Sequence, residues 1–298
     1  MANPSLLGDR EAADCPAPLF PPAARTAILL SMEPYLSELT QEDAVVLEGG
    51  KTHSSVVKVG STVRRPTGPW TIGVHALLRH LEVRGWRGAP RVLGIDSQGR
   101  EVLTYVTGEV VWPHHIDLVG TDDALASVGR HVRTYHDVAQ DFNPRGFAWS
   151  NRGCDPSGVA DVMCHNDLAA WNLVLSIDGW VFIDWDLAAP GRRAWDIAWA
   201  LLSLVPFRPD SGLDDECVAR RIRVFCEGYG IDDVPRDVVH VARERSAHEA
   251  DRIRTLGAAG KQPYDRLLAE GHYDVWSLLE THISRRAQEW TAKAFGVC

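Results

Sequence analysis

The stretch "CHNDLAAWNLVLSIDGWVFIDWD", residues 164–186, constrains the fold of this chain more than any other. Two apolar segments flank the dipeptide Asp178-Gly179, which is a strong signal for a two-residue β-hairpin turn. A turn centred there predicts three cross-strand pairs, namely Ile177 with Trp180, Leu175 with Phe182, and Leu173 with Asp184. Asn172 and Asp184 should therefore lie together at the open end of the hairpin.

The open end of this hairpin gathers groups suited to metal and proton chemistry. The Asn172 amide oxygen and the Asp184 carboxylate are hard oxygen ligands of the kind that Mg²⁺ takes. Asp167 lies in the loop just before the first strand, where a carboxylate can accept a proton from an attacking hydroxyl. A purely structural hairpin would account for the apolar residues, but polar groups are costly to bury without a task. The pattern indicates phosphoryl transfer.

Length and composition set the class of protein. The chain has 298 residues, 45 % of them hydrophobic and 24 % charged, which is typical of a globular enzyme with two lobes. Its formal net charge of -9 argues against a nucleic-acid partner. Its six cysteines form no C-x-x-C pair and are expected to be reduced. Without an apolar signal region or a membrane-length apolar run, we expect a cytoplasmic protein with no membrane partner and no obligate protein partner.

The order of predicted elements divides the chain into two parts. Short β-branched runs within 44–66 predict three antiparallel strands, and the apolar spacing of 74–81 predicts a helix. Two further strands should surround a turn at 96–99. After Gly108 the pattern is mostly helical, with segments at 121–140, 194–205, 214–229, 235–257 and 263–295. We expect a flexible tail at 1–25, a small lobe with a hinge at 26–107, and a catalytic and substrate-binding lobe at 108–298.

These motifs resemble a known family. "HNDLAAWN" at 165–172, followed by "FIDWD" at 182–186, resembles the catalytic loop and metal-binding segment of the aminoglycoside phosphotransferase family. The resemblance is sharp over 160–200 and extends in architecture over about 40–290. It implies an α+β, protein-kinase-like fold, with a small antiparallel-sheet lobe before a larger, mostly helical lobe. It also implies that the γ-phosphoryl group of ATP or GTP moves to a hydroxyl of a small molecule, with an antibiotic as the acceptor.

The resemblance also assigns roles to individual residues. Asp167 is implied to be the catalytic base and His165 to support the loop. Asn172 and Asp184 are implied to hold Mg²⁺. Asp196 matches an aspartate that begins a helix and braces the catalytic loop. The role of Asp186 stays open between a metal-site carboxylate and a solvated neighbour of that site.

The nucleotide side departs from the pattern of kinase-like enzymes, in which a strand lysine is positioned by a helix glutamate. The third strand, "TVRRP", places Arg64 at the lysine position, and the helix offers His75 where a glutamate is expected. Lys58 is an alternative phosphate ligand. If the strands are assigned one strand out of place, Lys58 and not Arg64 occupies the lysine position. By resemblance, the backbone of Thr104 and Val106 in the hinge would contact the adenine.

Three other interpretations account for part of the sequence. The segment 49–53, "GGKTH", resembles the end of a P-loop, but Val45 stands where that motif requires its first glycine, so we prefer a turn covering the phosphates. A metal-dependent hydrolase would use His165, Asp167 and Asp184 as ligands, but it leaves Asn172 unexplained. A nucleotide-binding pseudokinase acting as an interaction module would fit the missing lysine and glutamate.

Overall fold

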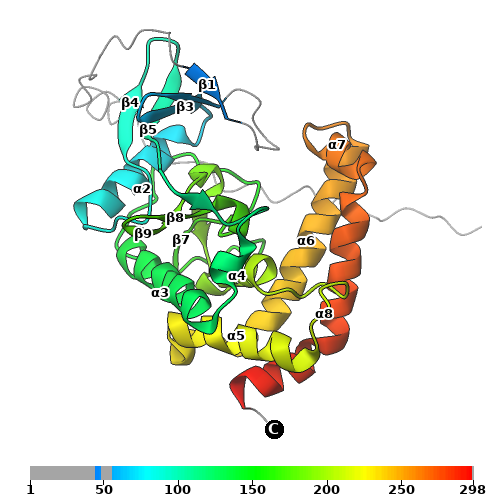
Figure 1. The fold of residues 1–298 in the computed structure, drawn as a ribbon. Coiled ribbons are helices and arrows are strands. Elements are labelled where there is room, and N and C mark those ends of the chain that lie inside the picture. The colour runs from blue at the N-terminus through cyan, green and yellow to red at the C-terminus, as the bar shows by residue number, and fades with distance from the viewer. Residues whose placement is uncertain (1–43, 48–55, 297–298) are drawn as a thin grey trace, which may run out of the picture.

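The computed structural model describes residues 44–47 and 56–296 (Figure 1). The predicted tail at 1–25 and the turn at 49–53 lie outside the described residues. Within the described part, a sheet with one helix is followed by a larger, mainly helical region, as predicted. Figure 1 shows the sheet at the upper left and the long helices α6 and α8 side by side on the right.

The first sheet has five antiparallel strands in the order β1-β2-β3-β5-β4. Their bounds are Ala44–Val46 (β1), Val57–Val59 (β2), Thr62–Pro66 (β3), Val92–Ile95 (β4) and Arg100–Thr104 (β5). Helix α2, Thr71–Val83, buries the apolar face predicted for it, namely Val74, Leu77, Leu78 and Leu81. The five predicted strands and their helix are therefore confirmed.

The helical region follows the predicted segments with one difference. Its helices are α3 (Asp122–Ala139), α4 (Arg193–Leu204), α5 (Asp215–Tyr229), α6 (Val238–Ala258), α7 (Tyr264–Ala269) and α8 (His272–Phe295). The segment 263–295, predicted as one helix, is divided because Gly271 adopts a φ of 79° between α7 and α8. A left-handed residue ends the first helix and lets the chain turn back.

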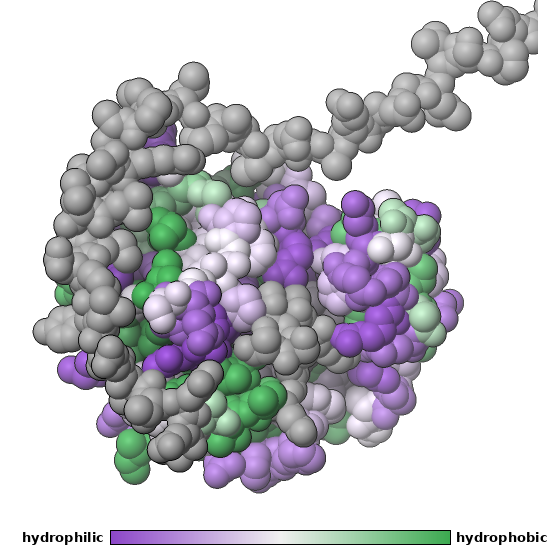
Figure 2. Space-filling model, turned by 90° about the horizontal axis from the view of Figure 1, so that it is seen from above, coloured by the Kyte–Doolittle hydropathy of each residue, from purple (hydrophilic) through white to green (hydrophobic). Residues whose placement is uncertain are grey.

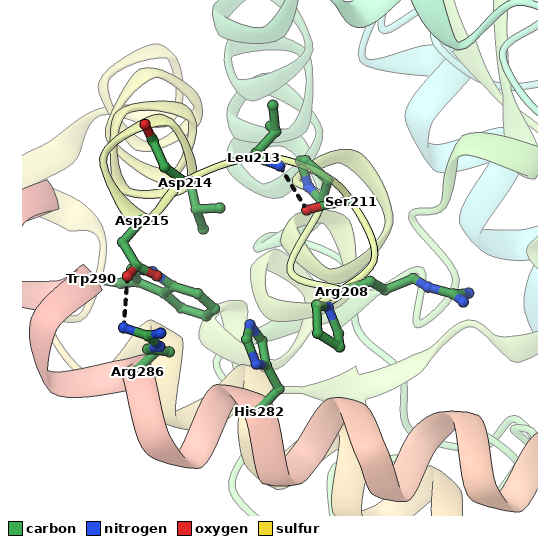
Figure 3. A pocket seen from close by; sticks show the side chains of 11 residues that line it. Arg208, Ser211, Leu213, Asp214, Asp215, His282, Arg286 and Trp290 are labelled. Atoms are coloured by element: carbon green, nitrogen blue, oxygen red, sulfur yellow. Dashed lines mark hydrogen bonds and ion pairs between the residues drawn. The ribbon is translucent and has the colours of Figure 1, made fainter.

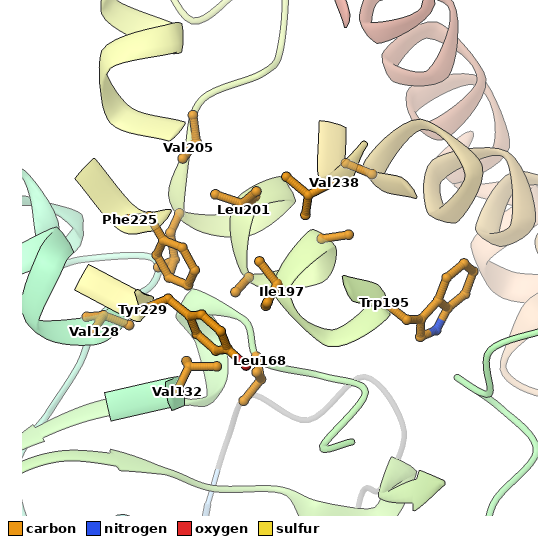
Figure 4. Close-up of a cluster of buried hydrophobic side chains, with 14 of the residues drawn as sticks. Val128, Val132, Leu168, Trp195, Ile197, Leu201, Val205, Phe225, Tyr229 and Val238 are labelled. Atoms are coloured by element: carbon orange, nitrogen blue, oxygen red, sulfur yellow. The ribbon is translucent and has the colours of Figure 1, made fainter. Parts of the chain in front are cut away.

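Helix α4 is the centre of the hydrophobic core. Nine of its residues are buried, including Trp195, Ile197 and Leu201. Figure 4 shows these side chains among residues contributed by α3, α5 and α6, such as Val132, Phe225 and Val238 in the labelled set. A helix that is apolar on most of its circumference must be surrounded by other elements. This burial fixes the position of Asp196, which α4 carries in its first turn.

Two smaller sheets carry the segment between α3 and α4 that contains Asp167 and Asp184. Strands β6 (Glu109–Val110), β8 (Leu173–Ser176) and β9 (Gly179–Phe182) form one of them, in the order β6-β8-β9. Strands β7 (Val162–Cys164) and β10 (Ala189–Gly191) form the other. A short 3₁₀ helix at Ala170–Asn172 leads directly into β8. A second one, at Trp185–Leu187, follows β9 after two residues.

The hairpin forms where the sequence predicted it, but with a different register. The observed pairs are Leu173 with Phe182, Val174 with Val181, Leu175 with Trp180, and Ser176 with Gly179. The turn residues are therefore Ile177 and Asp178, so each predicted pair was wrong by two positions. The Ser176 hydroxyl favours this turn because it accepts from the Asp178 N–H at 3.2 Å and donates to the Gly179 carbonyl at 2.9 Å.

The solvent face of the long helices is strongly polar. Figure 2 looks down on the molecule from above the view of Figure 1, and mostly hydrophilic residues cover the right-hand end, over α7. Exposed ion pairs lie there, such as Arg254 with Asp251 and Arg266 with Glu270. Among the helices that the structure describes, we find none both long enough and apolar enough to cross a membrane.

Candidate active site

Asp167 lies at the centre of the candidate site and is fixed by three side-chain donors. The Trp199 indole donates to its Oδ1 at 2.7 Å, and the Asn172 amide donates to its Oδ2 at 2.8 Å. The Trp171 indole reaches the same Oδ2 at 3.4 Å. Burial and the nearby charge of Asp184 raise the pKa of Asp167 to about 6, although the two indole N–H groups act in the opposite direction. A carboxylate poised in this range suits proton transfer near neutral pH.

The loop that carries Asp167 is braced by Asp196, as predicted. The Asp196 carboxylate is fully buried and accepts the backbone N–H groups of His165 and Asn166, each at 2.8 Å. The His136 imidazole contacts the same carboxylate at 3.1 Å. Burial opposes the charged form, but the hydrogen bond and charge of His136 hold the pKa of Asp196 below its ordinary value. Asp196 therefore stays ionised and holds the loop.

His165 supports the same loop through both ring nitrogens. Its Nδ1 accepts the Asp167 N–H at 3.2 Å, and its Nε2 donates to the Ile183 carbonyl at 3.2 Å. The ring therefore ties the loop to the segment that ends in Asp184. With both nitrogens in these contacts, His165 does not fit the ligand role that a metal-dependent hydrolase would give it.

Arg245 is a further support that the sequence did not single out. It extends from α6, is 3 % exposed, and donates to the carbonyls of Trp195 and Asn166. Its guanidinium lies 4.4 Å from the centre of the Trp199 ring, so it also holds the indole that contacts Asp167. One arginine among the four of α6 gave no signal of this role in the sequence, because only packing brings α6 against the loop.

Asn172 and Asp184 meet at the hairpin end in spite of the register difference. The Ile183 N–H donates to the Asn172 carbonyl at 2.9 Å, which places Asp184 next to it. Both hydrogen bonds from the Asn172 amide nitrogen go to Asp167, which turns its side-chain oxygen away from that residue. Asp184 adopts a left-handed conformation with a φ of 61°, a strained backbone that is common at functional sites.

One guanidinium joins this end of the hairpin to the first sheet. Arg65 of β3 donates from Nε to Glu101, from one terminal nitrogen to Asp184 at 2.9 Å, and from the other to Asp186. Asp186 is therefore a buried partner of Arg65 and not a solvated neighbour. One cation against three carboxylates leaves an excess of two negative charges. At this end of the hairpin the Asp184 carboxylate and the Asn172 side-chain oxygen are hard oxygen donors, the kind that fits a divalent cation such as Mg²⁺.

Arg64 does not reach this cluster, contrary to the sequence-based expectation. Successive residues of a strand point to opposite faces of the sheet, so Arg64 and Arg65 cannot share one face. Arg64 instead lies 3.6 Å from Asp96. Lys58 pairs in register with Val63 and so shares the face of Arg65, where its ammonium lies 4.1 Å from the centre of the Tyr105 ring. Of the two neighbouring arginines, Arg65 is the one that contacts the hairpin carboxylates.

The structure also shows the surroundings of His75 and of the hinge residue Thr104. His75 is buried, not exposed, and its Nε2 donates to Glu101 at 2.9 Å. In the hinge, the Thr104 N–H already donates to the Arg91 carbonyl at 3.0 Å. An adenine contact at Thr104 would therefore use its carbonyl oxygen. Val106 follows the end of β5, and its predicted role is untested.

A cavity of about 240 Å³ opens elsewhere in the helical region (Figure 3). It is lined by the 206–215 loop, by α5 and by α8, and it contains none of the predicted site residues. Its charged side chains already pair, Arg286 with Asp215 and Arg208 with Asp210. Within the described residues, we find no cluster of three or more histidine, cysteine or acidic side chains arranged to hold a metal ion by themselves.

Comparison with known proteins gives matches in both sequence and structure. A family model described as "Phosphotransferase enzyme family" matches residues 152–236, a range that includes Asp167, Asn172, Asp184 and Asp196. A trifolitoxin immunity protein from Rhizobium leguminosarum bv. trifolii is 32 % identical over 200 residues, covering 63 % of this chain and 75 % of that protein.

Three solved structures share the fold at low sequence identity. A choline/ethanolamine kinase family protein from Mesorhizobium loti is 15 % identical, with a TM-score of 0.59, covering 91 % of this chain and 98 % of that one. An amicoumacin kinase in complex with AMP-PNP, Ca²⁺ and Ami is 11 % identical, with a TM-score of 0.54 and coverages of 88 % and 93 %. The GDP and kanamycin complex of APH(2")-IIia is 14 % identical, with a TM-score of 0.52 and coverages of 88 % and 98 %.

Replacing the buried carboxylate of Asp196 should destabilise the protein. Asp196→Ala leaves two buried backbone N–H groups without an acceptor, and we expect it to lower the free energy of unfolding by about 3–5 kcal/mol. Denaturant unfolding measures the change. Asp123→Ala, at an exposed position in the first turn of α3, is the matched control and should change stability little. Equal stability of the two variants would show that the loop does not depend on Asp196.

Proposed function

Since this chain belongs to the phosphotransferase enzyme family, we propose that it moves the γ-phosphoryl group of ATP or GTP to a hydroxyl of a small molecule. The observation that carries the proposal is the position of Asp167, which lies between two indole N–H groups and Asn172, beside the Asp184 end of the hairpin. This arrangement supports the proposal, because phosphoryl transfer needs a group that can accept a proton, oxygen ligands for a metal ion and a cation near the phosphates.

The proposed reaction uses Asp167 as the base. The acceptor oxygen attacks the γ-phosphorus, the bond from that phosphorus to the β-phosphate oxygen breaks, and the nucleoside diphosphate leaves. The hydroxyl proton passes to the Asp167 carboxylate. With its pKa raised to about 6, this carboxylate is mostly ionised at neutral pH and can accept the proton. Trp199 and Asn172 keep its two oxygens oriented during the step.

Charge on the nucleotide is offset by groups at the hairpin end and on the sheet. Asn172 and Asp184 are the proposed Mg²⁺ ligands, and the ion, when bound, neutralises charge on the phosphate oxygens. We propose Arg65, in place of Arg64, as the phosphate-binding arginine, because it lies at this end of the hairpin and keeps its charge. Lys58 shares its face of the sheet and is a second candidate.

An antibiotic is the proposed acceptor, modified so that resistance results. The immunity protein is similar to this chain over most of its own length, and two structural neighbours are complexes with amicoumacin and kanamycin. In this chain the surface next to the base is aromatic. Trp171 is 42 % exposed and meets Trp199 edge to face, and Trp199 stacks on Trp276 with ring centres 5.2 Å apart. We therefore expect the acceptor to lie against indole rings.

A screen of hydroxyl compounds with ATP and with GTP tests this function directly. Each antibiotic is incubated with the full chain and Mg²⁺, and a mass increase of one phosphoryl group identifies the acceptor. Nucleotide binding without transfer to any compound would favour a pseudokinase. Turnover of a compound in the absence of nucleotide would favour a hydrolase.

Asp167→Asn should keep the fold and nucleotide binding but lower turnover by about 10²–10⁴-fold, because an amide cannot accept the proton. The rate of phosphoryl transfer and the Kd of the nucleotide are measured on the same preparation. Asp178→Asn, at the exposed turn of the same hairpin, is the matched control and should behave as the natural protein does. A folded Asp167→Asn variant with full turnover would remove Asp167 from this role.

Asp184→Ala should weaken Mg²⁺-dependent nucleotide binding, since it removes a charged oxygen ligand from the end of the hairpin. The measurement is a titration of nucleotide binding against Mg²⁺ concentration, with Asp178→Ala as the control at the other end of the hairpin. A Mg²⁺ dependence identical in the two variants would place the metal elsewhere.

Arg65→Ala should impair nucleotide binding far more than Arg64→Ala, because only Arg65 faces the hairpin carboxylates. Arg65→Lys should recover part of the loss, since the charge remains while the planar fork is lost. Lys58→Ala is measured alongside to compare the two candidates on one face. If Arg64→Ala proved the more damaging change, the assignment of Arg65 would be wrong.

A further inference from the structure

The side of Arg65 away from the hairpin is held by two buried residues from different elements. Glu101 of β5 stands opposite Arg65 of β3 in the sheet register and is 1 % exposed. Its Oε1 accepts the Arg65 Nε–H, and its Oε2 accepts from His75 Nε2 at 2.9 Å. His75 extends from α2 and is also 1 % exposed. Each carboxylate oxygen of Glu101 therefore has its own donor.

Glu101 remains charged in this buried place. Burial alone would favour the neutral acid, but the hydrogen bond from His75 and the charge of Arg65 hold the pKa of Glu101 below its ordinary value. The contact to Nε fixes the plane of the guanidinium, because Nε and the two terminal nitrogens are coplanar. The terminal nitrogens are then directed at the hairpin, where they contact Asp184 and Asp186.

We propose that Glu101 is the positioning residue for Arg65 in nucleotide binding, and that His75 acts by holding Glu101. This inference rests on the proposed function. The helix has no glutamate at the position where one was expected, and His75 stands there instead. The negative charge that orients the phosphate-binding cation comes from the neighbouring strand, and the helix contributes a hydrogen-bond donor to it.

The opposite face of the sheet offers a matched arginine–carboxylate pair. Arg64 lies 3.6 Å from Asp96, and Asp96 is otherwise engaged with Arg100 at the turn before β5. This pair joins β3 to the turn between β4 and β5, and among the described residues it has no contact with the hairpin carboxylates. Asp96→Asn therefore changes an equivalent charge without changing the orientation of Arg65.

The test measures the Kd of Mg·ATP and Mg·GTP by calorimetry on the full chain, with thermal unfolding recorded for every variant. Glu101→Gln keeps the size of the side chain and removes its charge, and we expect it to raise the nucleotide Kd about 10–100-fold, as for other residues that orient a binding group. Asp96→Asn should leave the Kd close to that of the natural protein. A purely structural role for Glu101 would lower the unfolding temperature and leave the Kd unchanged.

The two substitutions of His75 separate its role from simple packing. His75→Leu removes the donor and should raise the nucleotide Kd, whereas His75→Gln, which retains an N–H donor, should restore part of the affinity. Because His75 acts through Glu101, the double variant His75→Leu/Glu101→Gln should bind no more weakly than Glu101→Gln alone. If Glu101→Gln does not fold, the comparison of His75→Leu with His75→Gln decides the question.

The outcomes distinguish this inference from the proposed function. A natural protein that binds neither nucleotide would overturn both. A natural protein that binds nucleotide, together with a folded Glu101→Gln variant of equal affinity, would overturn only the positioning role. Additive losses from His75→Leu and Glu101→Gln would show that His75 does not act through Glu101.

Discussion

The candidate site depends on the guanidinium of Arg65. Its three nitrogen positions contact three carboxylates, one on the neighbouring strand of the sheet and two at the end of the catalytic hairpin. These partners are 36 to 121 residues away along the chain, so the contact joins the sheet to the hairpin. A buried arginine of this kind is stable only while its carboxylates remain, because an unpaired buried charge is costly. Replacing any one of these three carboxylates would therefore leave part of the Arg65 charge without a partner.

A second buried network holds the loop that carries Asp167. Asp196 accepts two backbone N–H groups of this loop, and Arg245 donates to the Asn166 carbonyl. Both residues lie on helices packed in the hydrophobic core, so their positions are fixed by apolar burial and not by the loop itself. The packed core holds α4 and α6 in place, and the buried hydrogen bonds of Asp196 and Arg245 hold the Asp167 loop against these helices. The indole of Trp199, also on α4, completes this support.

The hairpin forms where the local sequence predicted it, but its register differs. The turn signal located the hairpin, yet the Ser176 hydroxyl favours a turn one residue earlier, and every cross-strand pair differed by two positions. A shift of two keeps each side chain on its face of the sheet, so Asn172 and Asp184 still met. The assignment of Arg64 differed by one residue from Arg65, and neighbouring residues of a strand lie on opposite faces. Arg65 therefore faces the hairpin, and Arg64 lies against Asp96.

The sequence by itself located most of the helices and strands and the hairpin, since these depend on apolar periodicity and turn signals, and its resemblance to a known family pointed to Asp167, Asn172 and Asp196. Only the tertiary structure decided that Arg65 faces the hairpin, that Glu101 and His75 hold it, and that Trp199 and Arg245 support Asp167. Each of these contacts joins residues from separate elements, and no local pattern records which faces of two elements will meet. That choice is made by the packing of the whole core, where burial of apolar surface outweighs any single polar contact.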